Sequence, residues 1–132
     1  MAPHNDIGRI GEEIACKYLQ RKGYTVIDRN YRKPWGEIDI VVKIYSIIHF
    51  IEVKTVSREN ISIVPRENSA DGEYRAEDNI HPQKVARLKK IIQTYLLDKS
   101  NEDNEWVFDV ITVHLDTKNK RARVHLLSEV VL

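Results

Sequence analysis

Residues 36–55 read GEIDIVVKIYSIIHFIEVKT, and this stretch decides the fold. Two runs rich in β-branched residues, 38–44 and 47–56, are separated only by Tyr45 and Ser46. Such runs favour strands, and a two-residue separation is typical of a β-hairpin. Because Tyr-Ser is a poor sequence for a two-residue turn, a longer loop is the alternative. The stretch therefore predicts two antiparallel strands joined by a short turn.

Four charged side chains on this hairpin are placed by the strand period of two. Glu52 and Lys54 share one face of their strand, because successive side chains point to opposite faces. If the turn has two residues, counting outward from it places Asp39 opposite Glu52 and Glu37 opposite Lys54. A shift of one residue in the pairing would break this arrangement. The register thus predicts that the four charged groups converge.

A cation is a natural partner for the opposed carboxylates. Two carboxylates on directly opposed residues, with Cβ atoms about 5 Å apart, repel each other unless a positive charge neutralises them. Mg²⁺ suits this position, since it takes one or two carboxylates together with water and phosphate oxygens. The candidate ligands are Asp39, Glu52 and the carbonyl of Val53. The plainer alternative is a solvated strand face on which Glu37 and Lys54 form an ordinary ion pair.

The flanking sequence predicts further helices and strands. Apolar residues at three- and four-residue spacing predict amphipathic helices over 7–22 and from Pro82 onward. Further strands are expected over 24–30, 106–115 and 121–127. The order helix, three strands, helix, two strands indicates an α/β fold with a central mixed β-sheet flanked by helices.

The chain length predicts a single domain over residues 1–132, because typical domains hold about 100 to 150 residues. Hydrophobic residues make up 42% of the chain, which excludes a disordered protein. Residues 57–79 show no periodic pattern, and a structureless segment of this length is unusual inside a compact domain. We expect this segment to be either a mobile functional loop or a disordered one.

Composition excludes several classes of protein. No apolar run reaches the roughly 20 residues that span a bilayer, and the N-terminal sequence lacks a signal-peptide pattern, so we expect a cytoplasmic protein without a membrane partner. Cys16 is the single cysteine, which excludes an internal disulfide and a cysteine-rich zinc site. The five histidines are scattered along the chain. Of these, His49 and His114 are expected to face solvent from strands.

Basic residues are grouped on either side of the acidic hairpin. The formal net charge is only +1, which argues against binding nucleic acid by bulk charge. Lysines and arginines nevertheless concentrate in 17–33 and 84–90, an arrangement that suits a polyanion held at its edges. The candidate nucleic-acid contacts are Arg32, Lys33, Lys84 and Arg87. The alternative is that both segments are solvated helix faces.

A series of short motifs runs along the chain. They are Gly11-Glu12-x-x-Ala15, Tyr18-Leu19, Gly23-Tyr24, Gly36-Glu37-Ile38-Asp39, Phe50-Ile51-Glu52-Val53-Lys54-Thr55, Lys84, Leu88, Tyr95-Leu96 and Phe108-Asp109-Val110-Ile111. In this order they resemble the YraN-like family of predicted endonucleases, which is related to archaeal Holliday junction resolvases within the PD-(D/E)xK nuclease superfamily. The resemblance covers most of the chain and implies a restriction-endonuclease-like core.

The resemblance implies a site and a reaction. Asp39 and Glu52 would bind the metal, and Lys54 would be the catalytic lysine. Glu12, or its neighbour Glu13, would be the further acidic residue that the first helix contributes. The implied cofactor is Mg²⁺ or Mn²⁺, and the implied reaction is hydrolysis of phosphodiester bonds in DNA, with branched or structured DNA as the leading substrate. Related junction enzymes act as dimers, so a homodimer is an expectation.

The sequence departs from the family pattern at two places. Thr55 is followed by Val56, where such proteins commonly have a Thr-Arg pair, and the segment 57–79 is long for the family. Because a fold does not determine a function, a non-catalytic DNA-binding or partner-binding module on a nuclease-like scaffold is the alternative. A third interpretation is a structural protein whose charged strand face is merely solvated.

Overall fold

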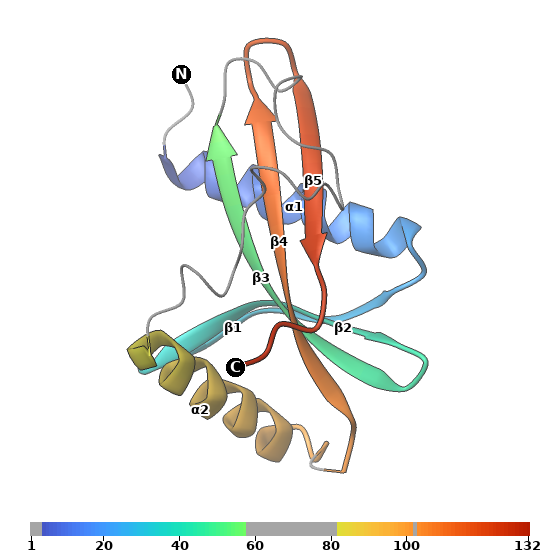
Figure 1. Cartoon of the computed structure of the whole chain (residues 1–132), viewed down its shortest axis with the longest axis vertical. Coiled ribbons are helices and arrows are strands. Elements are labelled where there is room, and N and C mark those ends of the chain that lie inside the picture. The colour runs from blue at the N-terminus through green and yellow to red at the C-terminus, as the bar shows by residue number, and fades with distance from the viewer. Residues whose placement is uncertain (1–3, 58–81, 102) are drawn as a thin grey trace.

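The computed structural model describes residues 4–57, 82–101 and 103–132 (Figure 1). Its elements are α1 (His4–Arg21), β1 (Thr25–Lys33), β2 (Gly36–Ile44), β3 (Ile47–Ser57), α2 (Pro82–Asp98), β4 (Trp106–Asp116) and β5 (Arg121–Leu127). The order of helices and strands is the predicted one. The segment 57–79 lies outside the described residues, apart from Ser57 at the end of β3. Within the described part of the chain, neither helix is long and apolar enough to cross a bilayer.

One mixed sheet contains all five strands, in the order β1-β2-β3-β4-β5. β3 and β4 are parallel, and the other neighbouring strands are antiparallel. Parallel neighbours need a crossover connection, and α2 lies in that connection. Figure 1 shows the strands strongly twisted, with α1 and α2 against different parts of the sheet. The predicted α/β fold is confirmed, and the arrangement is compatible with a restriction-endonuclease-like core.

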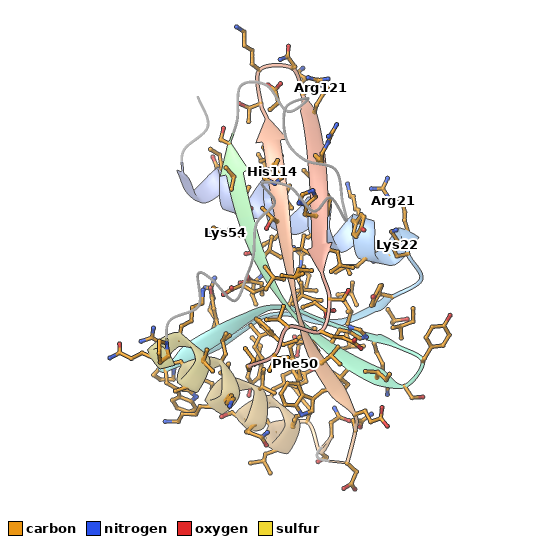
Figure 2. The ribbon with its side chains drawn as sticks, viewed as in Figure 1. Arg21, Lys22, Phe50, Lys54, His114 and Arg121 are labelled. Carbon is orange, nitrogen blue, oxygen red and sulfur yellow. The ribbon has the colours of Figure 1, made fainter. Side chains whose placement is uncertain are left out.

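The two helices cover opposite faces of the sheet. Ile51 belongs to the core beside α1, whereas Phe50 belongs to the core beside α2. These consecutive residues point to opposite sides of β3, as side chains of a strand do. Figure 2 shows Phe50 next to α2, with Lys54 further along the same strand. β3 is therefore covered by packed side chains on both faces, and its charged residues lie where this covering ends.

The turn between β2 and β3 has two residues, which confirms the predicted pairing next to the turn. The ladder ends at Ile40–Ile51, so it does not extend to the predicted pairs Asp39–Glu52 and Glu37–Lys54. Ile44 pairs with Ile47, and φ is 50° at Tyr45 and 65° at Ser46. A two-residue hairpin of this kind requires positive φ at both central residues, and glycine or asparagine usually provides it. The turn forms here without either, because the two hydrophobic strands fix its ends.

Two histidines that were expected to face solvent are buried, so that prediction is wrong. His49 Nδ1 lies 2.6 Å from Asp109 Oδ2, and the ring of Tyr24 packs edge-on against the imidazole. His114 is also buried, with its ring against that of His125. A polar side chain can be buried when the protein supplies its hydrogen-bond partner, and β4 supplies Asp109 to His49.

Helix α1 lies close against β3 at Gly11. A Cβ atom added at Gly11 would lie 1.9 Å from Thr55 Oγ1 and 2.8 Å from Thr55 Cβ. Both distances are shorter than van der Waals contact, and Thr55 is β-branched, so its side chain has little freedom to move away. Only glycine therefore allows α1 to lie at this distance from the sheet. The contact places the next residue, Glu12, beside the charged end of β3.

Gly11→Ala should lower the free energy of unfolding by about 1–3 kcal/mol, because the added methyl group overpacks the contact with Thr55. Urea unfolding at neutral pH measures the change. Gly8→Ala is the matched control on the same helix, since nothing lies within 4 Å of its added Cβ. This control should be as stable as the parent or up to about 1 kcal/mol more stable. Equal stability of Gly11→Ala and Gly8→Ala would contradict the close approach.

Candidate functional site

A cleft lies beside the sheet at the place where β2 and β3 separate. Its volume is about 390 Å³, and side chains from both helices and three strands line it. The charged lining residues are Glu12, Glu37, Asp39, Glu52, Lys54 and Lys84. The apolar lining includes Phe50, Leu88, Ile92 and Phe108. The cleft therefore brings together the predicted residues Asp39, Glu52, Lys54 and Glu12.

The separation of the two strands positions Asp39. The pairs between β2 and β3 run from Ile44–Ile47 to Ile40–Ile51, and Asp39 is the next residue of β2. Its carboxylate reaches across the gap, where Oδ2 accepts a hydrogen bond of 2.8 Å from the Val53 N–H. This bond holds Asp39 beside the segment Glu52–Val53, as the register predicts.

The alternation of side chains between the two faces of β2 is interrupted at Asp39. Ile38 lies in the core beside α2, whereas Ile40 lies in the core beside α1. Regular alternation would place both on one face. Asn30 of β1, which the β1–β2 register places opposite Asp39, has φ of 52°. Asparagine tolerates this left-handed conformation better than most residues. Asp39 therefore lies at a local change of face, which the sequence pattern did not predict.

Glu37 has a different partner from the predicted one. Its Oε2 lies 2.8 Å from Arg32 Nε, and the two residues pair across β1 and β2. The ion pair expected in the solvated-face interpretation, between Glu37 and Lys54, assumed that β2 and β3 stay paired to their ends. Because pairing with β1 continues where pairing with β3 stops, Glu37 is aligned with Arg32.

The structure distinguishes between the two acidic candidates of α1. Glu12 lines the cleft, while Glu13 is exposed and forms an ion pair of 3.1 Å with Arg29. Burial raises the pKa of Glu12 above its ordinary value, although the Arg29 guanidinium and a hydrogen bond with the Asn30 side chain oppose the rise. Glu12 is therefore the acidic residue that α1 contributes to the cleft.

Burial and nearby carboxylates make the ionised form of Asp39 unfavourable. Burial raises the pKa of Asp39 to about 7. The hydrogen bond from Val53 lowers this pKa, whereas the negative charges of Glu12, Glu37 and Glu52 raise it further. A cation between the carboxylates would stabilise their ionised forms.

The donor set fits a hard, hydrated cation. Asp39 and Glu52 offer carboxylate oxygens, and Val53 lines the same cleft. Among the described residues, no three histidine, cysteine, aspartate or glutamate side chains form a ready-made metal cage. Mg²⁺ does not need such a cage, because it commonly keeps several waters and uses one or two carboxylates. Asp39 and Glu52 could thus hold Mg²⁺ or Mn²⁺, with substrate and water completing the coordination.

Basic residues border the cleft on the side of α2. Lys84 Nζ lies 2.8 Å from Glu52 Oε1. Lys84 and Arg87 also line an adjoining hollow of about 310 Å³. Lys33, at the end of β1, lies with Nζ 5.3 Å from the centre of the Tyr31 ring. The predicted nucleic-acid contacts thus come from the end of β1 and the first turns of α2.

Two contacts of the site were missed by sequence reasoning. One is the ion pair of Lys84 with Glu52, for which the sequence carries no signal, because it depends on how α2 lies against the sheet. The other is the hydrogen bond between Asn30 and Glu12. An asparagine within a strand-like run is a weak signal of left-handed backbone, and it could have indicated the change of face.

Asp39→Asn should stabilise the metal-free protein at pH 8 by about 2 kcal/mol more than at pH 5. The carboxyl group has a raised pKa in the folded state, so its contribution to stability is lost as the pH rises through about 7. Asparagine keeps an oxygen acceptor for the Val53 N–H and has no charge. Urea unfolding in a chelating buffer at both pH values measures the difference. Parallel stability curves for the variant and the parent across this range would contradict the assignment.

Comparison with known proteins identifies the family. The family described as "Uncharacterised protein family UPF0102" matches residues 11–113. A UPF0102 protein of Flavobacterium psychrophilum is 33% identical over 119 residues, which cover 89% of this chain and 88% of that protein. One of Alkaliphilus oremlandii is 37% identical over 114 residues, covering 85% and 87%. One of Dictyoglomus thermophilum is 30% identical over 118 residues, covering 89% of each. The chain therefore belongs to the UPF0102 family, the YraN-like family that its motifs resemble.

Proposed function

We propose that this protein is a divalent-metal-dependent nuclease that hydrolyses phosphodiester bonds in DNA. The observation that carries the proposal is the cleft shared by Asp39, Glu52 and Lys54. Paired carboxylates suit a hard cation, and an ammonium group beside them can offset the negative charge that grows on a phosphate during attack. The resemblance to PD-(D/E)xK nucleases implies roles for these same three residues.

Each side chain has its own role in the proposed reaction. Asp39 and Glu52 would hold the cation, and the Val53 carbonyl would be a further ligand. The chemistry that bound Mg²⁺ or Mn²⁺ supplies is polarisation of a phosphoryl oxygen and activation of water. Lys54 orients the attacking water or stabilises the charge on the phosphate in the transition state. Glu12 is a further acid that orients water at the edge of the cleft.

Basic side chains beside the cleft support DNA as the substrate. Lys84 and Arg87 line the adjoining hollow, and Arg32 and Lys33 lie near the end of β1. Lysines and arginines that neutralise phosphates supply affinity independent of sequence. The likeness to junction resolvases favours branched or structured DNA. A homodimer would present two such clefts to the strands of a branched molecule.

A non-catalytic DNA-binding module is the second candidate function. The ion pair of Lys84 with Glu52 favours it, because Glu52 is neutralised without any metal ion. Such a module would bind branched DNA equally with and without Mg²⁺ and would cleave it in neither case. Cleavage of branched or flapped DNA that depends on Mg²⁺ or Mn²⁺ distinguishes the nuclease from the module.

Lys54→Ala should lower the cleavage rate by about two orders of magnitude or more, because it removes a charge that acts in the transition state. Lys54 is exposed, so the variant should unfold at nearly the same urea concentration as the parent. Gel assays on flapped and branched DNA with Mn²⁺ measure the rate.

Lys43→Ala is the matched control for this experiment. Lys43 also lies on a strand, but it lines a different hollow beside the β2–β3 turn. The Lys43→Ala variant should cleave DNA at the parent rate. Equal rates for Lys54→Ala and the parent would contradict the role of Lys54, and a parent that binds but never cleaves DNA would favour the module.

Arg87→Ala should weaken DNA binding severalfold and reduce the salt dependence of binding by about one released counterion. Fluorescence anisotropy at several salt concentrations, with Ca²⁺ in place of Mg²⁺, measures both quantities. Lys22→Ala is the control, because Lys22 lies at the far end of α1 (Figure 2) and lines the hollow beside the β2–β3 turn. An unchanged salt slope for Arg87→Ala would exclude Arg87 from the DNA interface.

A further inference from the structure

Lys84 and Glu52 form an ion pair at the edge of the cleft. Lys84 Nζ lies 2.8 Å from Glu52 Oε1, and the two side chains are 41% and 23% exposed. Lys84 belongs to the first turn of α2, and Glu52 belongs to β3. The pair therefore neutralises one of the four carboxylates that line the cleft.

A metal ion bound by Glu52 would compete with the Lys84 ammonium for the same carboxylate. Mg²⁺ binds carboxylate oxygens at about 2.1 Å, and an ammonium group held on the same carboxylate would be repelled by it. Glu52 is one of the two proposed metal ligands. Metal binding therefore favours the departure of Lys84 from Glu52 Oε1.

The surroundings offer Lys84 a second position. Lys84 lines both the cleft and the adjoining hollow, and Arg87 lines that hollow as well. A lysine ammonium is a compact charge on a flexible four-carbon chain, so it can turn between two nearby partners. Turned away from Glu52, it would join Arg87 on the side where phosphates of a nucleic acid are expected.

We propose that Lys84 is an exchangeable counter-ion, which pairs with Glu52 before a metal ion binds and turns to a substrate phosphate afterwards. This inference rests on the proposed function, because it requires that Glu52 bind the metal. The exchange of Lys84 between Glu52 and a phosphate would make the binding of metal and the binding of DNA reinforce each other. The metal frees the ammonium for the phosphate, and by thermodynamic reciprocity the phosphate draws it away from Glu52.

Calorimetric titration of the full chain with Mn²⁺, in the absence of DNA, tests the competition. Lys84→Met keeps most of the side chain and removes its charge. It should bind Mn²⁺ about threefold to fivefold more tightly than Arg87→Met. Arg87→Met is the matched control, because it removes a positive charge from the same helix and the same hollow. The difference between the two variants therefore isolates the direct contact with Glu52.

A second variant keeps the positive charge at position 84 and tests whether Mn²⁺ affinity then stays low. Lys84→Arg keeps the charge and can pair with a carboxylate through two parallel hydrogen bonds, so it should bind Mn²⁺ no more tightly than the parent. DNA affinity with and without Ca²⁺ gives a second readout. Ca²⁺ should raise the DNA affinity of the parent and of Arg87→Met by a larger factor than that of Lys84→Met.

Two results would overturn the proposal, and they can be told apart. Equal Mn²⁺ affinities of Lys84→Met and Arg87→Met, in a protein that does bind Mn²⁺, would overturn the exchange and leave the proposed nuclease site intact. Absence of saturable Mn²⁺ binding by the parent and by all three variants would overturn the metal site itself, and the exchange with it.

Discussion

The hydrogen bond from the Val53 N–H to Asp39 joins two strands just beyond the last pair of their ladder. Before Ile40, the residues of β2 pair with β1 alone, so this bond fixes the Asp39 carboxylate relative to Glu52. A buried backbone N–H needs an acceptor, and a buried carboxylate needs a donor. One contact meets both needs.

Repulsion between the negatively charged side chains of the cleft is a second constraint on the site. Four carboxylates line the cleft, and their mutual repulsion is partly balanced by basic residues from two elements, β1 and α2. Arg32 pairs with Glu37, Lys84 pairs with Glu52, and Arg29 lies near Glu12. Asp39 accepts a hydrogen bond from the Val53 N–H, and burial nevertheless raises its pKa to about 7. Proteins commonly accept such a local loss of stability where a binding site requires it.

The sequence predicted the hairpin and its register because two β-branched runs separated by two residues leave one way to pair. The pattern of alternation did not predict the change of face at Asp39, since alternation assumes extended backbone at every residue, and Asn30 gave only a weak signal of the departure. It left Glu12 and Glu13 as alternatives, because the direction in which a helix face points depends on tertiary contacts. The partner of Glu52 was missed for the same reason: no pattern in the chain between β3 and α2 fixes where that helix lies.

The parallel pairing of β3 with β4 determines when the cleft can form. Glu52 and Lys54 are synthesised early, yet the cleft also needs Leu88 of α2 and Phe108 of β4. Contacts between residues so far apart in sequence form slowly during folding. A nascent chain on the ribosome therefore carries the acidic motif without an enclosed site until translation has passed Phe108, and a C-terminally truncated product would keep the motif but not the cleft.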